Sequence, residues 1–170
     1  GIEISTLYGS LTNSGTISAT ATASAITSTA EATAYGIEMS TLYGSLANSG
    51  SIMASAKATN ETDSYAYAYA YGIEMSNLEG SLDNSGTISA SITAKNQNLL
   101  HSNDYPYGSA WGVSMGTVNG SFDNSGTITA SGQVTNNASW AGAYVDAVQS
   151  SGVGALGSFD NSGSSTASGQ

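Results

Sequence analysis

The chain has 170 residues and a formal net charge of −10 at neutral pH, with two lysines, no arginine and no cysteine. The lack of cysteine excludes a disulfide scaffold and a thiolate metal site. The scarcity of cations excludes a nucleic-acid binder, because nothing could neutralise the phosphates. The charge also argues against docking on anionic lipid, and no stretch is long and apolar enough to span a bilayer. We therefore expect no nucleic-acid partner and no membrane insertion.

One phrase, G-S-L/F-x-N-S-G, occurs five times. Its copies span residues 9–15, 44–50, 80–86, 120–126 and 157–163. Successive copies start 35, 36, 40 and 37 residues apart. A period of this size is typical of a solenoid, in which each unit buries its apolar face only against its neighbours. The repeats predict one β-solenoid domain over residues 1–170, with the last repeat incomplete.

Each repeat opens with a short strand of alternating apolar residues, at residues 1–4 and then 36–39, 72–75 and 112–115. The phrase follows with its apolar anchor and an Asn-Ser-Gly turn, whose glycine we expect to use positive φ. A second strand starts directly after the turn, at 16–19, 51–54, 87–90 and 127–130. An Ala/Ser/Thr stretch then runs to an aromatic–glycine junction such as Tyr35-Gly36.

The Ala/Ser/Thr stretches alternate every two residues and not every 3.6, which favours strand over helix. The fold class is therefore predicted to be all-β, a parallel β-solenoid of about 36-residue repeats. A repeat of this length spans roughly 120 Å of extended chain. One triangular coil of that size would enclose more volume than Ala, Ile and Leu can fill. We favour two coils per repeat, and one coil flattened into two sheets is the alternative.

Stacked repeats place identical residues above one another. The amides of the turn should form a hydrogen-bonded ladder, as stacked amides do in cross-β assemblies. Its members are Asn13, Asn48, Asn84, Asn124 and Asn161.

The same stacking predicts two acidic columns, formed by Glu3, Glu38, Glu74 and by Asp83, Asp123, Asp160. Like charges on adjacent strands repel, and a calcium ion could relieve that repulsion because it takes carboxylate oxygens readily. Solvation of the carboxylates is the alternative. Calcium is the only cofactor that the sequence suggests.

The tyrosines at positions 65, 67, 69 and 71 lie on one side of their strand. An unbroken strand would bury them together with Ile73 and Met75, which share their parity. A bend at Gly72 would instead turn the tyrosines outward and form an aromatic surface for self-association or ligand binding.

The sequence lacks the residues of an enzyme. His101 is the single histidine, and a lone histidine among serines is not a catalytic triad. The carboxylates are spread through the repeats, without the non-repeating acid pair that a glycosidase needs. We predict that the protein is not an enzyme.

The phrase GSLxNSGTIxA, followed by a Ser/Ala/Thr run and AYGI, resembles the passenger repeats of bacterial autotransporters and related haemagglutinin-like adhesins. The similarity covers nearly the whole chain. It implies a right-handed parallel β-helix that is secreted to the cell surface and works in adhesion or as a structural stalk.

Neither end of the repeat array carries a recognisable cap, and an uncapped solenoid end is a row of edge strands. We expect copies to stack head to tail into an extracellular filament, because such a contact does not close. The predicted interface residues are Ile2, Ile4, Leu7, Leu11 and Phe159. Against this, Ser165 replaces the isoleucine of earlier repeats and would act as a modest polar cap.

Two further functions stay open. The chain could be an adhesin stalk or passenger fragment that binds a surface or a glycan. It could also bind ice, for which regular Thr-x-Thr pairs such as Thr20-Ala21-Thr22 would have to recur in register.

Overall fold

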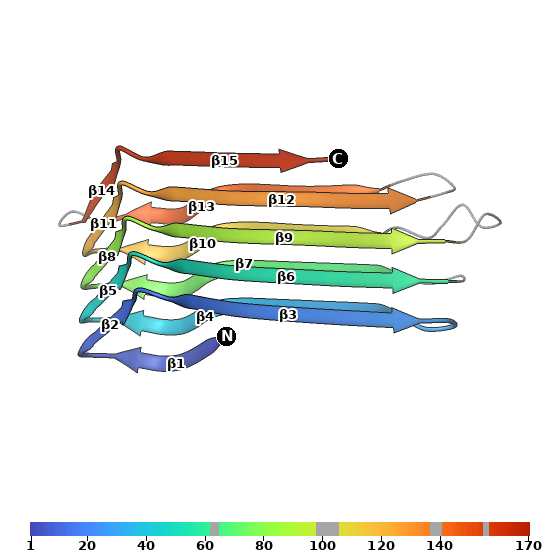
Figure 1. Ribbon diagram of the computed structural model, residues 1–170, viewed down its shortest axis with the longest axis horizontal. Helices are drawn as coiled ribbons and strands as arrows, with labels where there is room; N and C mark the ends of the chain where they lie inside the picture. Colours follow the sequence, from blue (N-terminus) through green and yellow to red (C-terminus); the bar gives the residue numbers. More distant parts are fainter. Residues whose placement is uncertain (62–64, 98–105, 137–140, 155–156) are drawn as a thin grey trace.

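The computed structural model describes residues 1–61, 65–97, 106–136, 141–154 and 157–170. Throughout these ranges the regular structure is β-strand, arranged in three parallel five-stranded sheets (Figure 1). The all-β solenoid fold predicted from the repeats is confirmed.

Each coil contributes one strand to each sheet. Sheet A contains β1 (Ile2–Leu7), β4 (Ala30–Leu42), β7 (Ala66–Leu78), β10 (Tyr107–Val118) and β13 (Gly142–Val153). Sheet B contains the short strands β2 (Ser10–Asn13), β5 (Ser45–Asn48), β8 (Ser81–Asn84), β11 (Ser121–Asn124) and β14 (Ser158–Asn161). Sheet C contains β3 (Thr16–Ala25), β6 (Ser51–Asn60), β9 (Thr87–Asn96), β12 (Thr127–Asn136) and β15 (Ser164–Gly169).

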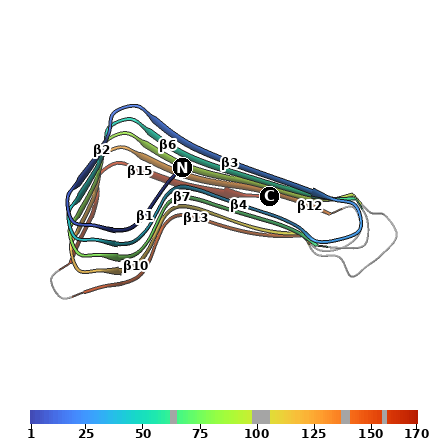
Figure 2. The ribbon, with the colours of Figure 1, turned by 90° about the horizontal axis from the view of Figure 1, so that it is seen from below.

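Each repeat forms one coil, so the prediction of two coils per repeat is wrong. Every strand pairs with its equivalent one repeat away, as in the register of Leu46 with Leu82 and of Ile52 with Ile88. The alternative of one flattened coil is confirmed for the coil count, but the coil has three sheets and not two. Its cross-section has a wide triangular part, here called the head, and a narrow two-layered part, here called the arm (Figure 2).

The two parts of the cross-section have different cores. Large side chains such as Ile52, Leu82 and Phe122 fill the head. The arm is filled almost entirely by alanines from sheets A and C, among them Ala56 and Ala68. Alanine lets two facing sheets approach closely, which is how a long coil avoids an unfilled interior.

A bend separates the arm and head segments of sheet A at Gly72. Alanines alternate inward up to Ala70, then Gly72 and Ile73 are buried in succession, and the alternation continues with the opposite parity. The tyrosines of β7 therefore point outward while Ile73 and Met75 enter the head core. Of the two arrangements that the sequence left open, burial of the tyrosines with these two residues is wrong, and the bend at Gly72 is confirmed.

The glycines of the Asn-Ser-Gly turns do not use positive φ, contrary to the prediction; no described glycine does. They are needed for close approach between coils. A Cβ at Gly86 would lie 2.2 Å from the carbonyl oxygen of Gly50 on the preceding coil. The backbones are too close there for any side chain.

Candidate functional site

The predicted asparagine ladder is present. Its side chains stack in register along sheet B. Each Nδ2 donates a hydrogen bond to the Oδ1 of the asparagine on the next coil. The donor–acceptor distances are 2.8 Å from Asn13 to Asn48, 2.7 Å from Asn48 to Asn84, 2.6 Å from Asn84 to Asn124 and 2.7 Å from Asn124 to Asn161. All donors in the ladder therefore point toward the C-terminal coil.

The glutamate column also forms as predicted. Glu3 pairs in register with Glu38, and Glu38 with Glu74, on the outward side of sheet A. Partial burial, and then the charge of Glu38, raise the pKa of Glu74 above its ordinary value. The column is continued by Ser114, which carries no charge.

The raised pKa of Glu74 predicts a pH-dependent stability. The fold favours the protonated carboxyl, so this stabilisation is present in acid and is lost as the pH rises through the raised pKa. Glu74→Gln should raise the free energy of unfolding at pH 7, measured by urea denaturation, by less than about 1 kcal/mol because the group is partly solvated. It should have little effect near pH 4. Glu31→Gln is the control, since its register neighbour is Tyr67 and not a carboxylate. An equal gain at both pH values would contradict the prediction.

The aspartate column runs along the outer side of sheet B, where Asp83, Asp123 and Asp160 follow one another in register. They line a shallow open hollow beside the asparagine ladder. Among the residues that the structure describes, no group of three or more acidic or histidine side chains is placed to hold a metal ion. Neither acidic column therefore gives geometric support to the calcium prediction.

The outer face of the sheet A arm carries an aromatic cluster. Tyr35, Tyr71 and Trp111 stack along the solenoid axis, with ring centroids 4.9 and 4.6 Å apart. Burial, and then the negative charge of Glu74, raise the pKa of Tyr71 and of Tyr35. The sequence signal for this column was the aromatic–glycine junction, because each of these residues directly precedes the glycine at which sheet A bends.

The remaining aromatic residues of the arm extend this surface sideways. The ring centroid of Tyr67 lies 5.6 Å from that of Tyr65 and 6.4 Å from that of Tyr69. The ring centroids of Tyr69 and Tyr107 are 6.3 Å apart. The ring centroids of Trp111 and Tyr144 are 5.9 Å apart. The column and these neighbours form one aromatic surface on the outside of sheet A.

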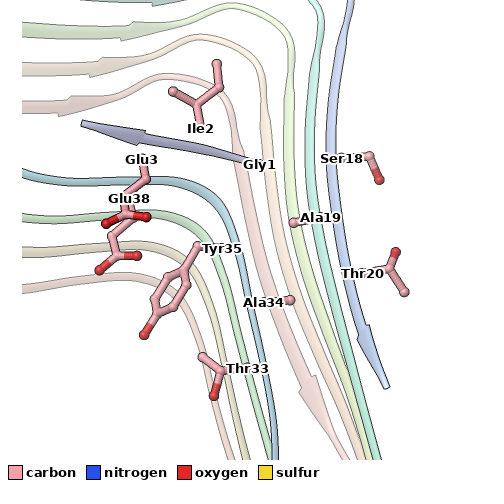
Figure 3. Close-up of a pocket in the computed structure, with 10 residues that line it drawn as sticks. All are labelled: Gly1, Ile2, Glu3, Ser18, Ala19, Thr20, Thr33, Ala34, Tyr35 and Glu38. Carbon is pink, nitrogen blue, oxygen red and sulfur yellow. The ribbon is translucent and has the colours of Figure 1, made fainter. Parts of the chain in front are cut away.

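Sequence reasoning missed how the charges are distributed between the broad faces. Both lysines, Lys57 and Lys95, lie on sheet C. Across the described ranges, no strand of sheet C carries a carboxylate, whereas sheet A carries those of Glu3, Glu31, Glu38, Glu74 and Asp146. Outward positions of sheet C are mostly serine and threonine. Figure 3 shows this arrangement, with Tyr35, Glu38 and Thr33 on one side of the two sheets and Ser18 and Thr20 on the other.

The threonines suggested for ice binding do not recur in register. Thr20 and Thr22 point outward on sheet C, but their partners on the next coil are Ser55 and Lys57. Ice binding therefore gains no support from the register.

The predicted assembly residues lie in the end coils. Ile2, Ile4, Leu7 and Leu11 are partly buried against the head core of the second coil. Phe159 stacks on Phe122 at 4.6 Å and is 43% exposed, whereas Phe122 is buried. Each of these side chains has one face covered by a neighbouring coil.

One hollow of the described surface opens between sheets A and C at the N-terminal end, where Ala19 and Ala34 lie between the two sheets (Figure 3). Two others are open spaces between outward side chains of sheet A. His101 lies outside the described residues, so the prediction that the protein is not an enzyme stays a prediction. Over the ranges described, no helix is long and apolar enough to cross a membrane.

No protein-family model, no curated protein and no solved structure matches the chain. The likeness to autotransporter passengers therefore stays a prediction drawn from the repeat phrases. What is established is the class of protein, a parallel β-solenoid repeat protein with one coil per repeat.

Proposed function

We propose that this solenoid is a structural subunit of a secreted extracellular fibre, lengthened by head-to-tail stacking of copies. The observation that carries the proposal is the polarity of the asparagine ladder. Asn161 accepts a bond from Asn124 and is exposed, so its own Nδ2 is free to donate to a further coil. Asn13, at the other end, offers its Oδ1, which accepts only the Gly15 amide at 3.2 Å. The two ends are complementary, so a copy added in register would continue the ladder.

Apolar side chains at the two ends support the same proposal. Stacking would cover Ile2, Ile4 and Leu11 at one end and Phe159 at the other, as the inner coils cover their equivalents. Burying one such side chain is worth about 1.5–3 kcal/mol. Backbone pairing of three edge strands at each end would add specificity of register.

A second candidate is an adhesin stalk that does not stack head to tail. Two residues of the C-terminal coil favour it. Ala147 occupies the column of Gly112, where a Cβ would lie 2.4 Å from the carbonyl oxygen of the coil above. Ser165 occupies the column of Ile128 and places a hydroxyl at a core position. Both residues oppose the addition of another coil.

Electron microscopy of the purified chain at neutral pH distinguishes the two functions. The head-to-tail proposal predicts long uniform fibres. The double variant Ala147→Gly/Ser165→Ile should polymerise at a concentration at least about tenfold lower than the wild-type chain does. It removes a steric block and restores an isoleucine that the added coil would bury. Thr166→Ser, on the outward side of β15, is the control and should leave polymerisation unchanged.

Each outcome assigns the function. Fibres from the double variant alone would favour the stalk. Short dispersed rods from both proteins would overturn head-to-tail assembly. Repeating the experiment with a chelator tests calcium binding. Removal of calcium should change fibre formation only if the acidic columns hold the ion.

A further inference from the structure

The two broad faces of the arm have opposite chemistry. The outer face of sheet C is flat and covered by short hydroxyl side chains, with Lys57 and Lys95 as its only charges among the described residues. The outer face of sheet A carries tyrosines together with Glu31 and Asp146. In a chain with a net charge of −10, the strands of sheet C carry no carboxylate among the described residues, and the nearest in sequence, Glu61, directly follows β6.

Both faces are straight over the arm. Figure 2 shows sheet C running straight along the whole cross-section, while sheet A runs beside it over the arm and bends away only toward the head. Lys57 and Lys95 lie on the arm, because their neighbours Ala56, Ala58 and Ala94 belong to the arm core. The lysines and the tyrosine face therefore occupy the same part of the solenoid, on opposite sides.

We propose that the outer face of sheet C of one solenoid docks, side by side, on the tyrosine and carboxylate face of sheet A of a second copy. Charge complementarity identifies a second copy as the partner, because one chain carries both the lysine face of sheet C and the carboxylate face of sheet A. The lysine ammonium groups would donate hydrogen bonds to the carboxylates and to the hydroxyl oxygens of the tyrosines. Serine and threonine lose little side-chain entropy on contact, and the tyrosines supply apolar area.

The area of the contact sets its strength. Strands of about six residues over four coils cover roughly 20 by 19 Å, or about 400 Å² per partner. A stable interface buries about 800 Å² per partner. One pair of solenoids should therefore associate weakly, and the contact becomes stable when stacked coils present it repeatedly. In that respect the inference rests on the proposed fibre.

The contact uses different surfaces on the two partners, so it does not close. Every docked copy leaves a free sheet C face on one side of the pair and a free sheet A face on the other. Repetition gives flat layers of parallel fibres, with neighbouring fibres spaced by the thickness of the arm, and not bundles with a fixed number of fibres.

The test compares the wild-type chain with Lys57→Ser/Lys95→Ser by electron microscopy and sedimentation velocity at low and high salt. Wild-type fibres should align into layers at low salt and separate at high salt, because the Debye length shortens. The lysine variant should give single fibres and at least tenfold weaker lateral association. Ser14→Asp/Ser125→Asp changes the net charge equally at exposed turn positions outside both faces, and should still form layers.

A charge exchange tests the partner face. Adding Glu31→Lys/Asp146→Lys to Lys57→Glu/Lys95→Glu restores complementarity with the signs reversed, and layers should return. Layers that persist in the lysine variant, or fail to return after the exchange, would overturn the inference.

The experiment separates this inference from the proposed function. Single fibres from the lysine variant would retain head-to-tail assembly and assign layering to the arm faces. If the wild type forms no fibre, the proposed function fails. Salt-sensitive self-association of the rods at high protein concentration, lost in the lysine variant, would then still support the lateral contact, and its absence would overturn that as well.

Discussion

Gly86→Ala should destabilise the solenoid by about 3 kcal/mol or more. The added Cβ would lie 2.2 Å from the Gly50 carbonyl oxygen and 2.7 Å from the carbonyl carbon of Ser49, both backbone atoms of the preceding coil. Backbone fixed by parallel ladders on both sides cannot move aside cheaply, so neighbouring coils would have to separate. Urea unfolding followed by circular dichroism measures the loss.

The matched control for this substitution is Gly15→Ala. Gly15 is the first member of the same glycine column, and a Cβ there would meet nothing within 4 Å. Its φ is not positive. The substitution should therefore be neutral, or stabilise by up to about 1 kcal/mol through the unfolded chain. Similar losses at Gly15 and Gly86 would show that coil contact is not the reason for the glycine.

Asn84→Ala should cost about 2–4 kcal/mol, the second large effect. Asn84 is buried at the middle of the ladder, accepting from Asn48 and donating to Asn124. Its removal leaves the Asn124 Oδ1 without its donor and weakens the bonding of the Asn48 amide. Each buried polar group left unsatisfied costs about 1–3 kcal/mol. The urea midpoint and the amide exchange of the flanking turns measure the effect.

Asn161→Ala is the comparison for the ladder. Asn161 is exposed and makes one ladder bond, in which it accepts from Asn124. Water can replace that bond at the end of the ladder, so the cost should be about 1 kcal/mol or less. Equal losses at Asn84 and Asn161 would mean that the bonds between buried amides are not what stabilises the ladder.

The fold class and the columns could be predicted because identical residues at a fixed period must stack. The register of Asn13 with Asn48 and of Glu3 with Glu38 follows from the repeat alone. The strands could also be predicted, because inward and outward residues alternate every two positions within each repeat.

The coil count could not be predicted, because it depends on how two sheets approach each other. Ala32 and Ala56 look like ordinary inward residues in sequence, yet only a pair of facing alanine surfaces allows a thin arm. The turn glycines were misassigned for a related reason. Their requirement comes from the neighbouring coil and not from their own φ.

The outward orientation of the β7 tyrosines depends on one residue. Gly72 reverses the inward parity of β7, and the sequence alone left open whether it would. The separation of charges between sheets A and C was hidden for the same reason, since assigning Lys57 and Glu31 to opposite faces requires knowing which way each strand faces.

The alanine core of the arm implies a gradient of local stability across each coil. A buried alanine methyl contributes about 0.8 kcal/mol, against about 1.5–3 kcal/mol for a buried leucine or isoleucine. Backbone amides of the arm should therefore open first and exchange their hydrogens faster than those flanking Leu82 and Phe122 in the head. The arm can therefore unfold and refold locally while the head of each coil stays folded.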